Sequence, residues 1–146
     1  MNMSFLDKWR KRSHPVRSVP LAESVSADPE SVVELLSECE LLRAQAAAEG
    51  VELDDSVASL EALDQLQPVW RDDPEVVSWL GNDAGLYLGT VLVRTVRDAV
   101  WHVWPDGQPV VRLASGREVD VVEAGHEWAD VGAPELSQVY AEAAES

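Results

Sequence analysis

The sequence predicts an α+β domain with N-terminal helices, a three-stranded antiparallel meander and C-terminal helices packed as one domain. Two helix starts of the form Asp-Pro-Glu, at Asp28 and Asp73, precede apolar residues at helical spacing. After Ala99 the pattern changes to short alternating runs rich in β-branched residues. Because helices and strands form separate blocks, α+β is favoured over alternating β/α units.

Two helices are predicted in the first part of the body. Proline in the first turn and apolar residues at helical spacing indicate a helix over 29–49, and Gly50 is its natural end. Cys39 lies on the apolar side of this helix, where a buried structural thiol is expected. A second helix follows, and its candidate N-caps are Asp54, Asp55 and Ser56.

The next segment predicts two shorter helices. The second Asp-Pro-Glu starts a helix over 74–80, which Gly81 is expected to stop. Asn82 or Asp83 then caps a helix over 84–95. This last segment is rich in β-branched residues, so a strand is the alternative.

Three short runs, at 99–104, 109–113 and 117–121, predict the strands of the meander. The turn pairs Asp106-Gly107 and Ser115-Gly116 separate them. A three-stranded sheet needs cover on one face, and the predicted C-terminal helices, over 121–129 and 134–144, supply it. One face of the first strand would carry Val100, His102 and Trp104, and the other Trp101 and Val103.

Six tryptophans are many for 146 residues. Four of them are expected to fill the core or its rim: Trp70, Trp79, Trp101 and Trp128. Trp104 stands just before a tight turn and is the best candidate for an exposed anchor, because tryptophan is enriched at binding hot spots.

The charge of the chain is unevenly distributed. Eleven basic residues stand against 27 acidic ones, a net charge of −16. Residues 1–17 carry five basic residues and one acid (+4), whereas residues 18–146 carry six basic and 26 acidic residues (−20). We therefore divide the chain into a basic amphipathic arm and linker (1–27) and one acidic domain (28–146). Such a body excludes a general nucleic-acid-binding surface, which needs cations facing phosphates.

Three further features of the sequence favour a soluble cytoplasmic protein. The single cysteine cannot form an intramolecular disulfide. The first 20 residues contain no apolar run of signal-peptide length. No stretch approaches the roughly 20 apolar residues that cross a membrane.

The arm combines apolar and basic residues and supplies most of the candidate partner-binding positions. It has three interpretations: it folds back on the acidic body, it docks on a protein partner, or it makes weak contact with anionic lipid. The candidate residues are Phe5, Leu6, Lys8, Trp9, Arg10, Lys11 and Arg12.

The sequence offers little support for a cofactor, a metal or catalysis. Gly85 and Gly89 do not form a phosphate loop and are expected to be packing glycines. Glu123 and His126 have Glu-x-x-His spacing, but a di-metal bundle needs a second such motif, so no metal or cofactor is expected. His102 with Asp106 or Asp120 would be the alternative, a catalytic dyad.

Two segments carry a resemblance: WLGNDAGLYLGT at 79–90 and WHVWPDGQPVVRLASGRE at 101–118. With FLDKWR at 5–10, they resemble a family of small uncharacterised proteins from Streptomyces and related actinobacteria. The resemblance covers most of residues 28–146 and implies a small soluble domain without catalytic residues to transfer. The central pattern is also loosely similar to small bacterial immunity-type domains.

The expected function is a non-enzymatic, cytoplasmic protein-interaction or regulatory module. Its partner would be a protein with a basic surface for the acidic body. One alternative is an immunity-like inhibitor of a basic toxin. The other is an uncharacterised enzyme that uses His102 or His126.

Overall fold

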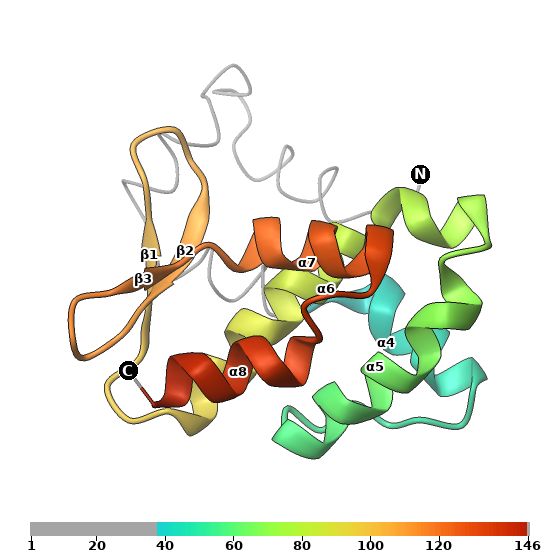
Figure 1. Ribbon diagram of the computed structural model, residues 1–146, viewed down its shortest axis with the longest axis horizontal. Coiled ribbons are helices and arrows are strands. Elements are labelled where there is room, and N and C mark those ends of the chain that lie inside the picture. The colour runs from blue at the N-terminus through green and yellow to red at the C-terminus, as the bar shows by residue number, and fades with distance from the viewer. Residues whose placement is uncertain (1–37, 146) are drawn as a thin grey trace, which may run out of the picture.

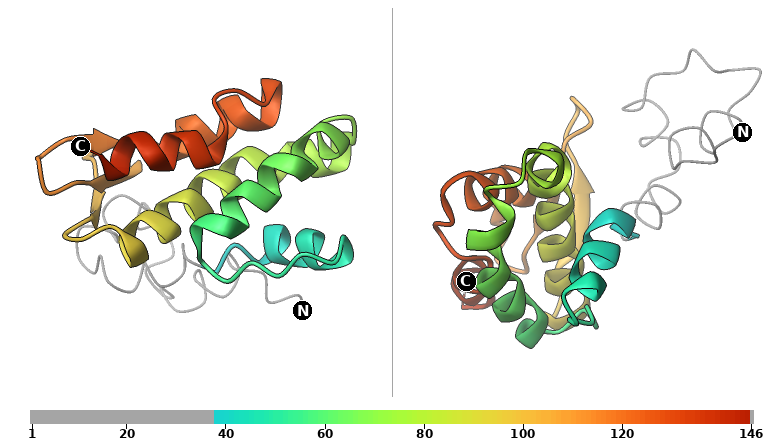
Figure 2. Two further views of the ribbon diagram at one scale, coloured as in Figure 1. Left: turned by 60° about the horizontal axis from the view of Figure 1, so that its bottom comes forward. Right: turned by 90° about the vertical axis from the view of Figure 1, so that its right-hand side faces the viewer.

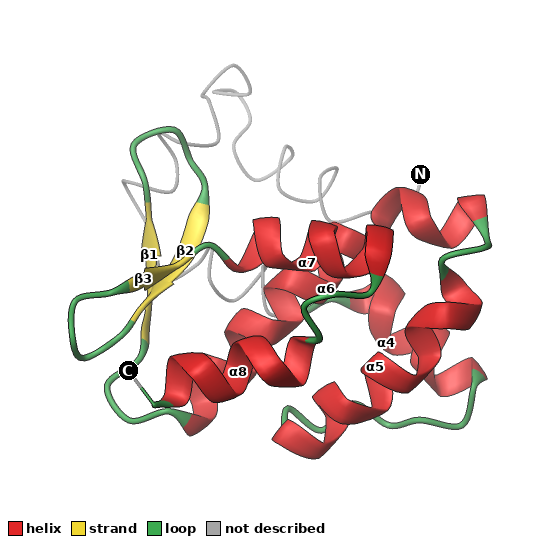
Figure 3. Cartoon of the chain, viewed as in Figure 1, coloured by secondary structure: helices red, strands yellow, loops and turns green. Residues whose placement is uncertain are grey.

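The computed structural model describes residues 38–145, and this part of the chain forms helices and one small sheet. The predicted α+β class is confirmed. The strands lie together at one end of the molecule, and the helices make up the rest (Figures 1 and 3). The elements are α4 (Glu40–Ala48), α5 (Val57–Trp70), α6 (Pro74–Thr95), β1 (Val100–Val103), β2 (Pro109–Arg112), β3 (Glu118–Val119), α7 (Val121–Val131) and α8 (Leu136–Ala144).

The central element is α6, a helix of 22 residues. Asp73 caps it by accepting a hydrogen bond from Glu75 N, and Pro74 occupies its first turn, as predicted. The prediction that Gly81 ends this helix is wrong, and so is the prediction of a new cap at Asn82 or Asp83. The chain stays helical through all three residues, and the helix over 84–95 is its continuation.

Glycines explain why α6 continues at Gly81. The most extensive contact in the fold is between α6 and α7, and glycines occupy both sides of it. A Cβ atom on Gly85 would lie under 3.0 Å from backbone atoms of Val121 and Val122, and one on Gly125 would meet the backbone of Gly81 and Gly85 equally closely. The two backbones therefore approach closely because no side chain separates them, and Gly81 serves this contact instead of a helix end.

The sheet packs on the same row of glycines. Its order is β1-β2-β3, and both pairs are antiparallel, which confirms the predicted meander. Trp101, Val111 and Val119 lie opposite one another on the inner face. A Cβ on Gly89 would overlap the Trp101 ring, so this glycine leaves the space into which the indole packs.

The remaining helices differ from prediction mainly at their ends. Residues 38 and 39 are not helical, and Cys39 has left-handed backbone angles (φ 43°), so the predicted helix over 29–49 is interrupted there and the first described helix begins at Glu40. The predicted start at Pro29 lies outside the described residues. Ser56 caps α5, as predicted. The third strand is shorter than predicted because Asp120 already caps α7.

The helices lie on both sides of a central pair. α7 and α8 lie on one side of α5 and α6, and α4 lies on the other (Figure 2, left). Trp70 and Trp128 are fully buried, and Trp79 and Trp101 are partly buried against the core, as expected. Contrary to the sequence expectation, α6 is long and apolar enough to cross a membrane by length and composition alone. However, 67% of its most apolar window is buried inside the fold.

We predict that Gly85→Ala destabilises the fold severely. Its Cβ would collide with the backbone of α7, which cannot move without shifting the whole helix, so the loss should exceed about 3 kcal/mol. Unfolding in urea, followed by tryptophan fluorescence, measures the change.

Gly50→Ala is the control for this substitution. Its Cβ meets open space, and its cost comes from the positive φ of 79° alone, about 1 kcal/mol. Equal losses for the two variants would contradict the close helix approach.

Candidate functional site

The outer face of the meander gathers three polar or aromatic side chains around one carboxylate. Glu118 on β3 accepts hydrogen bonds from Trp104 Nε1 (3.0 Å) and from Arg112 Nη2 (3.0 Å) and Nε (3.2 Å). His102 Nε2 lies 3.7 Å from the same carboxylate. The hydrogen bonds from Trp104 and Arg112 hold the pKa of Glu118 below its usual range. Glu118 therefore joins side chains that come from β1, β2 and the turn after β1.

Trp104 is not the exposed anchor that the sequence suggested. It is partly buried, and its indole N–H is committed to Glu118. Because Trp104 follows β1 and Glu118 lies on β3, the indole must reach across the central strand. Val110, which shares this outer face, is fully buried. Trp104 thus helps to hold the sheet together.

The two histidines of the described chain lie apart. His102 is on the outer face of the sheet, with 36% of its side chain exposed. His126 is exposed on α7, where its ring lies beside Gly81. Neither Asp106 nor Asp120 is the carboxylate found beside His102, which is instead Glu118. Asp106 accepts from Gln108 N, and Asp120 caps α7 and accepts from Gln108 Nε2.

Asp64 connects three helices at the entrance of a cleft. From α5 it accepts hydrogen bonds from Trp128 Nε1 (2.9 Å) on α7, and from Leu136 N (2.9 Å), Ser137 N (3.2 Å) and Ser137 Oγ (2.7 Å) at the start of α8. The residue at the N-cap position of α8, Glu135, makes no side-chain cap. Asp64 therefore caps α8 from another helix.

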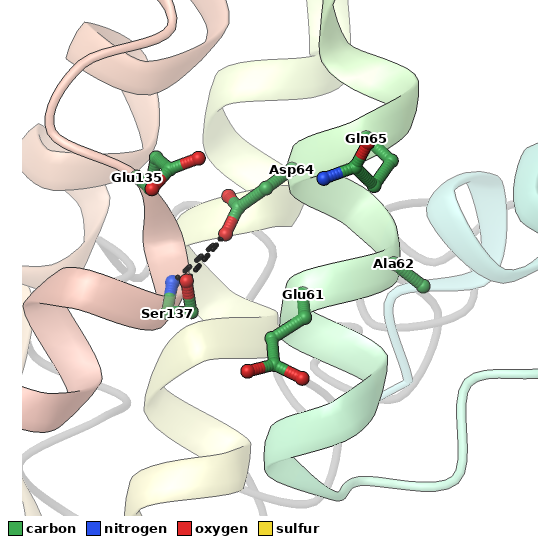
Figure 4. Close-up of a pocket in the computed structure, with 6 residues that line it drawn as sticks. All are labelled: Glu61, Ala62, Asp64, Gln65, Glu135 and Ser137. Carbon is green, nitrogen blue, oxygen red and sulfur yellow. Dashed lines mark hydrogen bonds between the residues drawn. The ribbon is translucent and has the colours of Figure 1, made fainter.

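The cleft itself lies between α5 and the start of α8 and has a volume of about 430 Å³. Carboxylates dominate its lining, and Figure 4 shows Asp64 and Glu135 close to one another with Glu61 one turn away. Asp64 is engaged in the helix cap, whereas Glu61 and Glu135 are exposed. The lining residues are Glu61, Ala62, Asp64, Gln65, Glu135 and Ser137.

Asp83 repeats this arrangement for α4. Cys39, at the N-cap position of α4, makes no side-chain cap, and Asp83 Oδ2 on α6 accepts from Leu42 N instead (3.2 Å). Burial raises the pKa of the Asp83 carboxyl above its usual value, and the nearby Glu40 adds to the rise. Burial also raises the pKa of the Cys39 thiol to about 12, so this residue is a thiol at neutral pH.

A third carboxylate fixes the loop before α5. Asp55 pairs with Arg43 of α4 (3.0 Å) and with Arg94 of α6 (3.1 Å). Its backbone N–H donates to the hydroxyl of Tyr87 (2.8 Å), which also shares a hydrogen bond with Ser59 (2.7 Å). This network connects α4, α5 and α6, and it engages two of the six arginines of the described chain.

The charge of the body is segregated between helices and sheet. Residues 38–145 contain six arginines and 22 acidic residues, a net of −16. Residues 97–119, which hold the meander, contain three of each and are neutral. The remaining described residues therefore contain three arginines against 19 acids. The helical part carries the whole net charge.

Asp64 and Glu118 were not predicted to organise the fold, and Asp55 and Asp83 were predicted only as N-cap candidates, for the second helix and for a helix over 84–95. One signal was available for two of them, because Cys39 and Glu135 are poor N-caps and leave a helix start without a partner. The predicted partner-binding residues of the arm, Phe5 to Arg12, lie outside the described residues. Within residues 38–145, no group of three metal-ligating side chains is present.

We predict that Asp64→Ala destabilises the protein by at least about 2 kcal/mol, because four charge-assisted donors lose their acceptor. Amide hydrogen exchange should accelerate at Leu136 and Ser137 in particular. Glu61→Ala, one turn earlier and exposed, should change stability by less than about 0.5 kcal/mol. Normal protection at the start of α8 in Asp64→Ala would contradict the cap.

We predict that Asp83→Asn is neutral or stabilising at pH 7. The Asn oxygen still accepts from Leu42 N without burying a charge. Because the folded pKa of Asp83 is raised, its folded state binds the proton more tightly, and its contribution to stability falls as pH rises from below 3.8 through the raised pKa.

The advantage of Asp83→Asn should therefore be largest at neutral pH and vanish near pH 3. Urea unfolding of both proteins across this range measures it. A variant that is less stable than wild type at pH 7 would show that the charge itself holds α4.

Comparison with known proteins identified a family but no individual related protein or solved structure. Neither the curated proteins nor the solved structures yielded a match to this chain. The model of a family of unknown function, DUF6278, matches residues 1–146, the whole chain. This agrees with the expected resemblance to an uncharacterised family. The chain belongs to the family of unknown function DUF6278.

Proposed function

We propose that this protein is a non-enzymatic, cytoplasmic interaction or regulatory module whose helical part binds a protein with a basic surface. The observation that carries the proposal is the acid-lined cleft between α5 and α8, set in a helical part with 19 acids against three arginines. Two of these arginines, Arg43 and Arg94, pair with Asp55, and neither lines the cleft. Such a field steers a cationic partner toward the surface.

The cleft supplies the geometry for that partner. Asp64 is held in place by its helix-cap hydrogen bonds, whereas Glu61 and Glu135 are exposed at the rim. Rim carboxylates of this kind pair with an arginine or lysine of a docking protein. The basic arm, residues 1–17, would supply a second contact with the same partner.

The test is affinity capture of binding partners from the cytoplasm of the native host, with this protein as the bait. Glu61→Gln with Glu135→Gln should lose a partner that wild type retains, and higher salt should release that partner from wild type because the contact is electrostatic. Glu123→Gln with Glu127→Gln is the matched control, since it removes the same charge from exposed positions on α7.

A chain lacking residues 1–17 measures the contribution of the arm. Equal capture by both double variants would show that the cleft is not the contact. Capture that resists salt would show that the contact is not electrostatic.

A further inference from the structure

The first strand of the meander has an edge that faces away from the sheet. In the order β1-β2-β3, β1 has one strand neighbour among residues 38–145. Trp104 N donates to Gln108 O (3.0 Å), so that N–H points toward the second strand. Since successive N–H groups alternate in direction, those of Trp101 and Val103 point outward. Outward N–H and C=O groups are a template for pairing with another strand.

Among residues 38–145, several features that usually block such an edge are absent from β1. The four residues Val-Trp-His-Val contain no proline and no lysine. Their pairing with β2 runs without a bulge from Val100 to Val103. Side chains on the outer face leave room beside the edge, with Val100 51% and His102 36% exposed. The other edge strand, β3, has two residues and leads directly into α7.

Charge favours a second copy of this chain as the occupant of the edge. Two bodies of net charge −16 repel each other across any contact that involves their helical parts. Residues 97–119 are neutral, with three arginines and three acids, so the repulsion between two copies is weakest when they approach through this region.

We propose that β1 pairs antiparallel with β1 of a second copy across a two-fold axis, giving a continuous six-stranded sheet. The contact is isologous, as in most homodimers. A four-residue strand buries little surface, so the dimer is weak and depends on concentration. The proposal does not use the acid-lined cleft and does not depend on the proposed function.

Salt distinguishes the two proposals. Screening reduces the repulsion between two acidic bodies, so salt strengthens self-association. The same screening weakens the attraction between the cleft and a basic partner. Either proposal can therefore fail without the other.

Sedimentation equilibrium of the full chain tests the dimer. The mass should rise above 16.0 kDa with concentration, and more steeply at about 500 mM than at about 50 mM NaCl. Val103→Pro removes an outward N–H and leaves the hydrogen bonds to β2 in place, so association should weaken at least about tenfold because the two-fold axis doubles the loss. Val103→Ala, which retains the N–H, is the control.

Val100→Glu provides a second variant that does not alter the backbone. Val100 is half-exposed, so the substitution should preserve the fold while it places a negative charge from each copy beside the shared edge. Circular dichroism checks folding of every variant. A chain that stays monomeric at all concentrations and salts overturns the proposal.

Two further outcomes also overturn it. One is a dimer that is unaffected by both Val103→Pro and Val100→Glu, which would use another face. The other is concentration-independent protection of the Trp101 and Val103 amides from hydrogen exchange. That protection would mean that a segment of the same chain covers the edge.

Discussion

The close approach of α6 and α7 sets the position of most other elements. Gly81, Gly85 and Gly89 lie four residues apart and form one smooth side of α6. The first two contact α7, where Gly125 completes the crossing, and the third leaves space for Trp101 of the sheet. This row of glycines, which carry no side chains, therefore sets the positions of both α7 and the sheet. The short third strand follows from this arrangement, because Asp120 must end the sheet to cap α7 at the crossing.

Several acidic residues serve the fold as well as the surface. Asp64 and Asp83 each cap a helix that has no side-chain cap of its own. A carboxylate also interacts favourably with the positive end of the helix dipole. α4 and α8 therefore depend on contacts with α6 and α5, which is expected of helices of nine residues that would be marginal alone. An acidic composition does not by itself indicate a binding surface, whereas the uneven distribution of the acidic residues over the molecule does.

Local signals in the sequence predicted the elements well, and long-range contacts explain the errors. Ser56, Asp73 and Pro74 act within one turn, so their roles could be predicted. Gly81 has the same local signal whether it ends a helix or contacts another helix, and only its position against α7 decides. Asp64 caps Leu136 across 72 residues, beyond the reach of any capping motif. Trp104 failed as an exposed anchor because Glu118, on a different strand, engages it.

The charge of the described body is segregated, with strongly acidic helices at one end and a neutral meander at the other. Paramagnetic relaxation of backbone amides by a cationic nitroxide, compared with its neutral analogue, maps this potential directly. The cationic probe should enhance relaxation over the helical part, most strongly near Glu61 and Glu135, and should match the neutral probe over β1 to β3. Equal enhancement over helices and sheet would show that the charge is not segregated.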